Sequence, residues 1–311
     1  MKVKIVTKPG MISETDWHPL SLKASVDYYE TDHVSARELA SLCDDYDCLM
    51  LNFDVAEPFD VSFYDLVASK KLRLISCDIT GMSWAFPSVA RAHNIVLCNT
   101  PNYCTESVAE HIFAQMLLLS RRIHETYVDF SEGKTPEIRK GFDLKGKTIG
   151  IIGLGHIGTR VAEIATGFNM KVLTWNHRPK ASVYNQVDLD TLLTTSDVIV
   201  ICLKTTDSTL GFLDNEKLKK CKSNAIIINQ AGEQLINKDH VYDGIIHNTI
   251  AGYAGTLNND ETHELYKHRS VVALPANAWY SDDSLENLRR IWVENVIRFI
   301  EGDCINVVSA D

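Results

Sequence analysis

The sequence lacks any uninterrupted run of about 18 apolar residues, the length that a membrane-spanning helix needs. Its first ten residues, MKVKIVTKPG, alternate as a strand does and lack the apolar core of a secretory signal peptide. Basic residues are also scarce, with 31 Lys and Arg against 41 Asp and Glu, a formal charge of -10. Nucleic acids and anionic membranes need surfaces with clustered cations. We therefore expect a cytoplasmic protein whose partner is a small-molecule substrate, not nucleic acid or a membrane.

The eight cysteines form no CxxC pair and no group with histidine at zinc spacing. They are scattered at positions 43, 48, 77, 98, 104, 202, 221 and 304. Most lie within strand or helix patterns, where a reduced thiol serves as a small apolar side chain. We expect neither a bound metal nor a disulfide.

What the sequence does contain is a regular alternation of strand-like and helix-like segments. In the first hundred residues the strand-like runs are KVKIV, DCLMLNF, LRLISCDI and IVLCNT, and the helix-like runs are ARELASLC, FYDLVAS and FPSVARAH. A second series begins at Thr148, with the strand-like runs KTIGIIGL, KVLTWN, DVIVICL, AIIINQ, NTIAGYAG and SVVALPA. Such alternation predicts parallel sheets with helices on both faces, and 311 residues suffice for two domains.

Two longer helix patterns accompany these series. Residues 105–127 have apolar residues at helical spacing, with Thr105 as the N-cap, and predict one continuous helix. The segment SLENLRRIWVENVIRFIEG near the C-terminus predicts an amphipathic helix. Its length would let it cross back to the first domain.

A glycine-rich loop follows the first strand of the second series. Gly153, Gly155 and Gly158 form G-x-G-x-x-G between a buried strand and a helix, with His156 and Ile157 inside the motif. Glycines permit a tight turn and a close backbone approach, and a helix N-terminus attracts a pyrophosphate. In this context the motif predicts a dinucleotide-binding loop, whereas an isolated motif of this kind would be weak evidence.

The next strand ends without the usual carboxylate. In dinucleotide-binding folds, Asp or Glu at this point binds the ribose 2′-hydroxyl. Here Asn176 is followed by His177, Arg178 and Lys180, which can bind a 2′-phosphate that a carboxylate would repel. These residues favour NADP as the cofactor, with NAD as the alternative. They could also be ordinary solvated loop charges.

The order of these segments resembles the D-isomer-specific 2-hydroxyacid dehydrogenase family. The resemblance rests on NTPNYCTESVAEH, LKGKTIGIIGLGHIG, DVIVICLKTTDSTLGFL, AIIINQAGEQL, TIAGYAG and VVALPA, which together cover nearly the whole chain. It implies an α/β fold with two doubly wound parallel-sheet domains. A Rossmann dinucleotide-binding domain, residues 101–284, would be inserted into a flavodoxin-like substrate-binding domain, residues 1–100 and 285–311. It also implies a homodimer formed through the cofactor domains.

The resemblance further implies a catalytic Arg, Glu and His, which this sequence mostly lacks. The family's Arg follows a strand in a pattern like N-T-A-R-G-G, whereas here the strand continues N-Q-A-G-E-Q and places Gly232 at the Arg position. The Glu corresponds to Glu261, and the His position after L-P is Ala276. No Arg lies between Arg178 and Arg269, so a small shift of the alignment restores nothing.

Other side chains must therefore supply the chemistry if the protein is active. We expect catalytic roles for Glu261, Tyr253, Tyr280 and Lys204, the last as a cation where the family commonly has Pro. Besides the loop and the residues after the second strand, we expect cofactor contacts from Cys202, Lys204, Thr209, Gln230, Ala231 and Gly232. Substrate contacts are expected from Asp78, Gly81 and Asn277.

Three hypotheses about function follow from these residues. The first is an NAD(P)-dependent oxidoreductase with an altered active site and a substrate other than an ordinary 2-keto acid. Aromatic residues on the substrate side, Trp84, Phe86, Trp279 and Tyr280, would suit an uncharged or aromatic compound. The second hypothesis is a catalytically silent dinucleotide-binding sensor or scaffold. The third is a non-redox enzyme that retains the cofactor.

Overall fold

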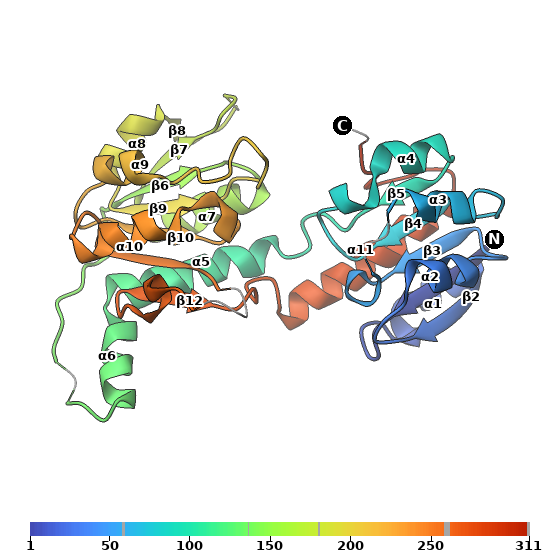
Figure 1. Ribbon diagram of the computed structural model, residues 1–311. Coiled ribbons are helices and arrows are strands. Elements are labelled where there is room, and N and C mark those ends of the chain that lie inside the picture. Colours follow the sequence, from blue (N-terminus) through green and yellow to red (C-terminus); the bar gives the residue numbers. More distant parts are fainter. Residues whose placement is uncertain (58–59, 136, 180, 258–261, 310–311) are drawn as a thin grey trace. The chain divides into compact units, whose positions relative to one another are not determined.

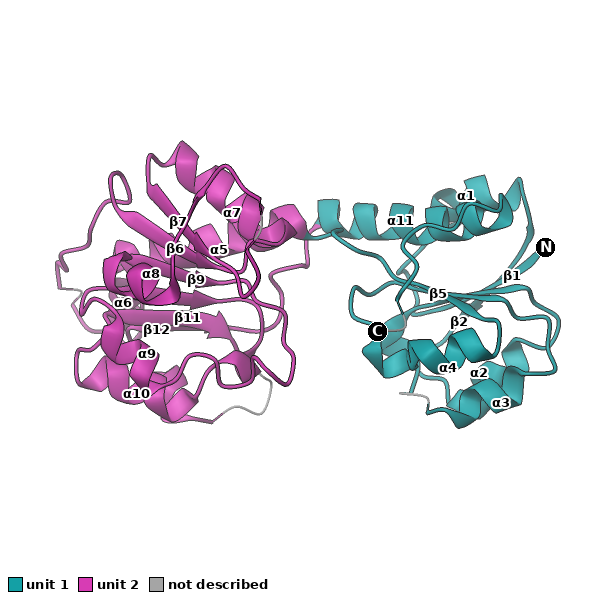
Figure 2. Ribbon diagram, turned by 90° about the horizontal axis from the view of Figure 1, so that it is seen from above, with its two compact units in different colours: residues 1–104, 282–311 teal, residues 105–281 magenta. Residues whose placement is uncertain are grey.

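The computed structural model describes residues 1–57, 60–135, 137–179, 181–257 and 262–309. The chain forms two compact units, which Figure 2 distinguishes by colour. Unit 1 comprises Met1–Cys104 with Asp282–Asp311, and unit 2 comprises Thr105–Ser281. Unit 2 is thus an insertion into unit 1. The divisions lie at 104/105 and 281/282, whereas the sequence analysis expected them at 100/101 and 284/285.

Unit 1 contains a parallel sheet of five strands in the order β2-β1-β3-β4-β5. The strands are β1 (Lys2–Thr7), β2 (Ser25–Glu30), β3 (Cys48–Leu51), β4 (Leu74–Cys77) and β5 (Val96–Cys98). The helices are α1 (Glu14–Ser21), α2 (Ala36–Leu42), α3 (Ser62–Val67), α4 (Pro87–Ala92) and α11 (Asp282–Ile300), with short η1 (Phe53–Val55) and η2 (Ser83–Ala85). Strand order reverses between β1 and β3, and ligands in such sheets bind outside the carboxyl ends of the strands at this point.

Both faces of this sheet are buried, because successive side chains of a strand point to opposite faces. One face packs against residues of α2 and α3, among them Leu39 and Phe63. The other face packs against α1 and the C-terminal helix α11, whose Trp292 is fully buried. The indole N–H of Trp292 donates to the Ser76 carbonyl at 2.8 Å, which fixes α11 on β4. Residues from the two ends of the chain therefore share one core.

Unit 2 contains a parallel sheet of seven strands in the order β12-β11-β10-β9-β6-β7-β8. The strands are β6 (Thr148–Ile152), β7 (Lys171–Trp175), β8 (Asn185–Gln186), β9 (Val198–Ile201), β10 (Ile226–Asn229), β11 (Gly252–Thr256) and β12 (Val271–Leu274). The helices are α5 (Thr105–Ser120), α6 (Ile123–Ser131), α7 (His156–Gly167), α8 (Leu189–Thr195), α9 (Asn215–Lys220) and α10 (Lys238–Ile246), with short η3 (Glu233–Leu235) and η4 (Glu264–Lys267). The predicted pair of doubly wound parallel sheets is confirmed (Figure 1).

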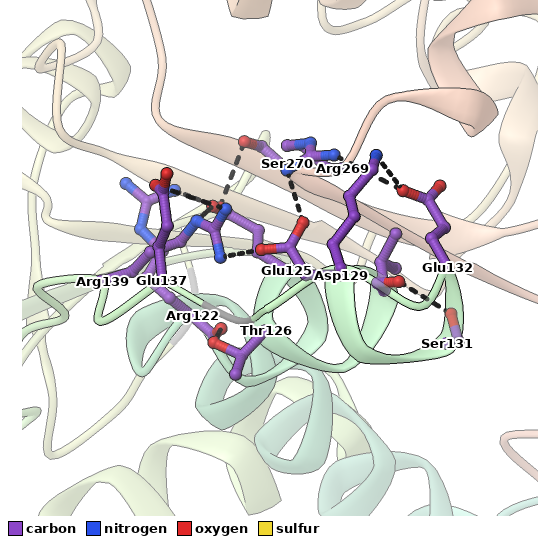
Figure 3. Close-up of polar contacts among 12 residues, drawn as sticks. Arg122, Glu125, Thr126, Asp129, Ser131, Glu132, Glu137, Arg139, Arg269 and Ser270 are labelled. Carbon is purple, nitrogen blue, oxygen red and sulfur yellow. Dashed lines mark hydrogen bonds and ion pairs between the residues drawn. The ribbon is translucent and has the colours of Figure 1, made fainter.

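The prediction of one continuous helix over residues 105–127 is wrong. The helix breaks between α5 and α6, where Arg122 adopts a left-handed backbone with φ of 54°. A later segment of the chain binds at this break: the Phe142 N–H donates to the Ser120 carbonyl at 2.8 Å. Beyond the break, Glu125 and Asp129 of α6 are buried and bind arginines from two other segments (Figure 3). These contacts are tertiary, so local helical spacing could not reveal them.

The sequence analysis also missed β2 and α1. The β2 sequence SVDYYE is mostly polar because the strand lies at the edge of the sheet. Helix α1 contains Pro19, a residue that normally ends a helix. Among the described residues, no helix combines the length and the apolar character that crossing a membrane requires.

Candidate cofactor and substrate sites

The glycine-rich loop lies where the strand order of unit 2 reverses, between β6 and β9. Gly153 has φ of 100°, and a Cβ there would lie 2.7 Å from the Cys202 carbonyl oxygen at the end of β9. A Cβ on Gly158 would collide with the Gly153 carbonyl. At Gly155, by contrast, no described atom lies within 4 Å of the Cβ position. The loop is therefore tightly packed on the protein side and open at Gly155, directly before the N-terminus of α7, which fits a pyrophosphate.

Asn176 holds this loop in place through its side chain. Its Oδ1 accepts a hydrogen bond from the Leu154 N–H at 2.7 Å. Its Nδ2 is buried and has no hydrogen-bond partner among the described residues. Because an unpaired buried donor is costly, this nitrogen fits a ligand oxygen beside the loop. His177 and Arg178 follow as exposed residues, and Lys180 lies outside the described part of the chain.

The other residues expected at the cofactor lie in the first turn of α7 and in the loop after β9, and they differ in exposure. His156 is exposed and Ile157 is half-buried in the first turn of α7. Cys202 is partly buried, and burial raises the pKa of its thiol to about 12, so it stays protonated at neutral pH. The Thr209 hydroxyl binds within its own loop, accepting from the Thr206 N–H at 2.8 Å and donating to the Lys204 carbonyl at 2.9 Å. These bonds shape the loop and leave the Lys204 side chain exposed.

Gln230 and Ala231, which the sequence analysis expected to contact the cofactor, follow β10 and make hydrogen bonds that hold its end in place. The Gln230 amide donates to Gln115 of α5 at 2.8 Å, and its oxygen accepts from the Thr256 hydroxyl at 3.2 Å. The Ala231 N–H donates to the Asn229 side chain at 3.2 Å. Gln230 therefore joins β10 to α5 and β11, a structural role that uses both ends of its amide.

Gly232, where the sequence analysis expects the family's arginine, has an unusual backbone. Its φ of 144° and ψ of 141° belong to a region that side-chain-bearing residues rarely adopt. A Cβ there would lie 2.9 Å from the Thr205 hydroxyl and 3.0 Å from Gln234 Oε1. Thr205 also donates to the Ala231 carbonyl at 3.3 Å, which joins the loops after β9 and β10. In this structure a side chain at position 232 would therefore be disfavoured by the backbone conformation and would press on two neighbouring side chains.

The two candidate tyrosines lie in very different surroundings. Tyr253 is completely buried in the core of unit 2, and burial raises the pKa of its phenol well above the ordinary value. In this structure Tyr253 therefore has no exposed surface from which to donate a proton to a substrate, as the sequence analysis expected it to do. Tyr280 is 65% exposed, and its ring lies edge-on to Trp279 with centroids 5.1 Å apart. Asn277 is exposed in the same turn, and Glu261 lies outside the described residues.

Unit 1 carries a buried carboxyl group at the carboxyl end of its sheet. Asp78 accepts hydrogen bonds from the Phe53 N–H at 2.7 Å and from the Asn52 amide at 2.5 Å. Burial raises the pKa of Asp78 to about 6 in spite of these bonds. The Asn52 Oδ1 is buried without a hydrogen-bond partner among the described residues. This pair lies beside the strand-order reversal of unit 1, where a ligand is expected.

Aromatic side chains border this carboxyl. The rings of Phe53 and Trp84 lie 5.2 Å apart, and the Trp84 indole donates to the Gly81 carbonyl at 2.9 Å. Gly81 is exposed, with no described atom within 4 Å of its Cβ position. The sequence analysis missed Asn52 and Phe53. The available signal was a polar residue directly after the buried strand CLML.

Comparison with known proteins finds relatives that match most of the chain. A family model described as D-isomer specific 2-hydroxyacid dehydrogenase, NAD binding domain, matches residues 113–278. Hydroxypyruvate reductase of Thermotoga maritima is 31% identical over 277 residues, which cover 86% of this chain and 88% of that protein. Glyoxylate reductase of Thermococcus litoralis is 30% identical over 258 residues, 78% of each chain. The solved structure of a D-2-hydroxyisocaproate dehydrogenase has the same fold, with a TM-score of 0.87, 18% identity and 99% of each chain covered.

Proposed function

Since the chain belongs to the D-isomer specific 2-hydroxyacid dehydrogenase family of NAD(P)-dependent oxidoreductases, we propose that it uses NADP to interconvert a carbonyl and a hydroxyl group in a substrate other than an ordinary 2-keto acid. The observation that carries this proposal is Gly232. Its backbone conformation is one that side-chain-bearing residues rarely adopt, and a side chain there would press on Thr205 and Gln234. The glycine-rich loop nevertheless keeps the close contacts that a dinucleotide needs.

The cofactor preference rests on the residues after β7. Asn176 carries no negative charge, and its free Nδ2 can donate to a phosphate oxygen. The exposed Arg178 can add a second, charged donor. We assign the pyrophosphate to the loop at Gly155 and the 2′-phosphate to Asn176 and Arg178. Bound NADPH supplies the hydride, and the protein must position the carbonyl and provide a proton.

The substrate class follows from what the site lacks. An arginine binds a substrate carboxylate with two hydrogen bonds, and its loss removes that recognition. Removing one electrostatic donor typically costs about 100 to 1,000-fold in rate, and a missing general acid costs about 100 to 10,000-fold. Glyoxylate and hydroxypyruvate, named for the relatives, should therefore react slowly here. We propose an uncharged or aromatic carbonyl compound as the substrate.

Two residues of unit 2 are candidates for the chemistry. We propose Tyr280 as the proton donor and Lys204 as a positive charge for the developing alkoxide, because both side chains are exposed at loops that follow strands. Asp78, Gly81 and Asn277 are the proposed substrate contacts. The buried Oδ1 of Asn52, which has no partner among the described residues, suits a substrate that donates a hydrogen bond.

We also propose that the protein is a homodimer formed through unit 2. Ile123, Tyr127 and Phe130 lie on one face of α6 at helical spacing and are exposed. They line a cavity of about 430 Å³ together with Arg121 and Thr126. An apolar face of this kind commonly marks an interface. A second copy of the chain is the partner that the family's usual assembly suggests.

Binding of NADPH and NADH by the purified protein tests the cofactor proposal. Fluorescence titration should give at least about tenfold tighter binding of NADPH, about 1.4 kcal/mol. Arg178→Ala should lose this preference, and Arg91→Ala, at an exposed arginine of unit 1, should retain it. Equal affinities in the wild type would contradict the NADP assignment.

Turnover then separates an enzyme from a silent cofactor-binding protein. NADPH oxidation should be faster with uncharged aldehydes and ketones than with glyoxylate or hydroxypyruvate. Tyr280→Phe should slow that turnover without weakening NADPH binding. Tight NADPH binding with no turnover of any carbonyl would favour a dinucleotide sensor, which keeps the loop but needs none of the catalytic residues. Loss of a substrate with no net change in NADPH would favour a non-redox enzyme.

A further inference from the structure

A polar pocket lies at the amino ends of the strands in unit 2. It has a volume of about 370 Å³ and is lined by turns that precede β10, β11 and β12 and by Arg122, which connects α5 and α6. The glycine-rich loop lies at the carboxyl ends of the strands in the same parallel sheet. The pocket is therefore at the opposite edge from the cofactor site, and the proposed reaction does not use it.

The lining combines four apolar residues, Ile245, Ile246, Ile250 and Ala251, with polar side chains that can donate hydrogen bonds. Its polar side chains are Arg122, Ser223, Asn224, Asn248, His268 and Ser270, and none of the described lining residues is Asp or Glu. This composition is unexpected in a chain with a formal charge of -10. The volume lies at the lower end of the range for small-molecule sites. It suits a small ligand rich in acceptors.

Arg122 is held in position by a buried ionic network behind the pocket (Figure 3). Its guanidinium donates to Glu125 at 2.6 Å, and Glu125 also binds Arg139 at 3.3 Å and the Ser270 hydroxyl at 3.3 Å. Asp129 binds Arg139 at 2.5 Å and Arg269 at 2.9 Å. Three arginines thus surround two buried carboxylates.

Glu125 does not need all the N–H groups of the Arg122 guanidinium. Glu132 and Glu137 lie 4.0 Å from Arg269 and Arg139. Both acidic side chains are on the outer side of the network and more exposed than Glu125. A guanidinium has five N–H groups, so Arg122 can bind Glu125 and still offer donors elsewhere.

His268 adds a second donor at the pocket. Its Nδ1 accepts a hydrogen bond from the Ser270 N–H at 3.2 Å, so Nε2 carries the proton. Arg122 keeps its left-handed backbone, with φ of 54°, at the pocket wall. Strained conformations of this kind persist where the surrounding structure holds them and are common at ligand sites.

We propose that this pocket binds a small phosphorylated metabolite, with the phosphate between Arg122 and His268. Phosphate offers several acceptors to a charged donor that geometry has already fixed. Asn224, Asn248 and Ser223 supply donors for its oxygens and for hydroxyl groups of the attached moiety. The site is independent of the cofactor, so it does not depend on the proposed activity.

Calorimetric titration with inorganic phosphate as the probe tests the site in the full-length protein. Wild type should bind phosphate, and Asn224→Asp should weaken that binding at least tenfold because it places a like charge in the pocket. Asn224 is exposed, so the variant should fold; its melting temperature checks this. Asn287→Asp, the same change at an exposed residue of α11, should bind phosphate as the wild type does.

Saturation with NADPH distinguishes this pocket from the cofactor site, where Arg178 is itself proposed to bind a phosphate. NADPH should leave the phosphate affinity of the pocket unchanged, because the glycine-rich loop and Arg178 are at the other edge of the sheet. His268→Gln, which replaces the imidazole with an amide, should weaken phosphate binding. No phosphate binding by the NADPH-saturated wild type, or equal binding by Asn224→Asp, would overturn the proposal.

Discussion

At the scale of single residues, Gly232 matters for its backbone conformation as well as for its missing side chain. A glycine in an ordinary conformation could be replaced by arginine in one mutational step. The φ of 144° at Gly232, together with the nearby Thr205 and Gln234 oxygens, disfavours any side chain at this position. Restoring the arginine alone should therefore not restore 2-keto acid reduction.

Alanine at Gly232 measures this adaptation. We expect Gly232→Ala to lower the free energy of unfolding by about 1 to 3 kcal/mol, the usual range for a strained backbone position. Gly146→Ala is the matched control, because Gly146 also has a positive φ, 76°, but has open space at its Cβ position. The control should cost less in urea unfolding. Equal losses would show that contacts with Thr205 and Gln234 play no part.

Asp78 makes stability depend on pH in a direction opposite to that of most carboxylates. Burial raises its pKa from 3.8 to about 6, so the folded protein keeps this proton at pH values where the unfolded chain has lost it. Between about pH 4 and pH 6 the folded state binds more protons, and the contribution of Asp78 to the free energy of unfolding falls as pH rises. The full difference corresponds to about 3 kcal/mol.

Asp78→Asn should remove this pH dependence. Relative to wild type, the variant should gain up to about 3 kcal/mol in unfolding free energy as pH increases from 4 to 7. Urea unfolding of both proteins at each pH measures the difference. Asp32→Asn, at an exposed carboxylate, controls for the chemistry of the substitution. A difference between Asp78→Asn and wild type that does not change with pH would refute the pKa assigned to Asp78.

At the scale of elements, different glycines of the turn from β6 to α7 serve folding and cofactor binding. Gly158 packs against the Gly153 carbonyl, whereas Gly155 faces open space and has φ of -83°, which any residue can adopt. Gly158→Ala should therefore destabilise the fold by about 1 to 3 kcal/mol, as overpacking does. Gly155→Ala should keep the wild-type melting temperature and weaken NADPH binding at least tenfold. Unchanged NADPH affinity in Gly155→Ala would mean that the loop is only a structural turn.

The same elements show what local sequence can and cannot predict. Apolar runs such as TIGII and IIIN are buried on both faces and were recognised as strands, and the glycine spacing identified the loop between β6 and α7. The break at Arg122 was not predictable, because it depends on Phe142 and on arginines distant in sequence. Gln230 and Tyr253 were assigned to the site because they lie at or near strand ends. In the structure the Gln230 amide binds Gln115, and Tyr253 is buried in the core of unit 2, neither of which the local sequence could show.

At the scale of the whole molecule, an insertion joins two sheets that each have a strand-order reversal. Candidate cofactor residues are all in unit 2, whereas Asp78 and Gly81 are in unit 1. The sequence order predicted this division of labour through the family resemblance. It could not predict Asn52, because only the pairing of β1 with β3 shows that this residue lies beside a strand-order reversal.

Self-association is a property of the whole molecule, and the exposed apolar side chains of α6 provide a way to test it. Tyr127 and Phe130 are 66% and 70% exposed, and hiding such rings from water would stabilise a dimer by roughly 25 cal/mol for each Å² of apolar surface buried. We expect the wild type to have twice the chain mass of 34.9 kDa in size-exclusion chromatography with light scattering, and Tyr127→Glu/Phe130→Glu to have the chain mass. Leu22→Glu, at an apolar residue of unit 1 that is 75% exposed, should remain dimeric. A monomeric wild type, or a double variant that stays dimeric, would exclude α6 as the interface, because two buried carboxylates without partners cannot be accommodated in an apolar contact.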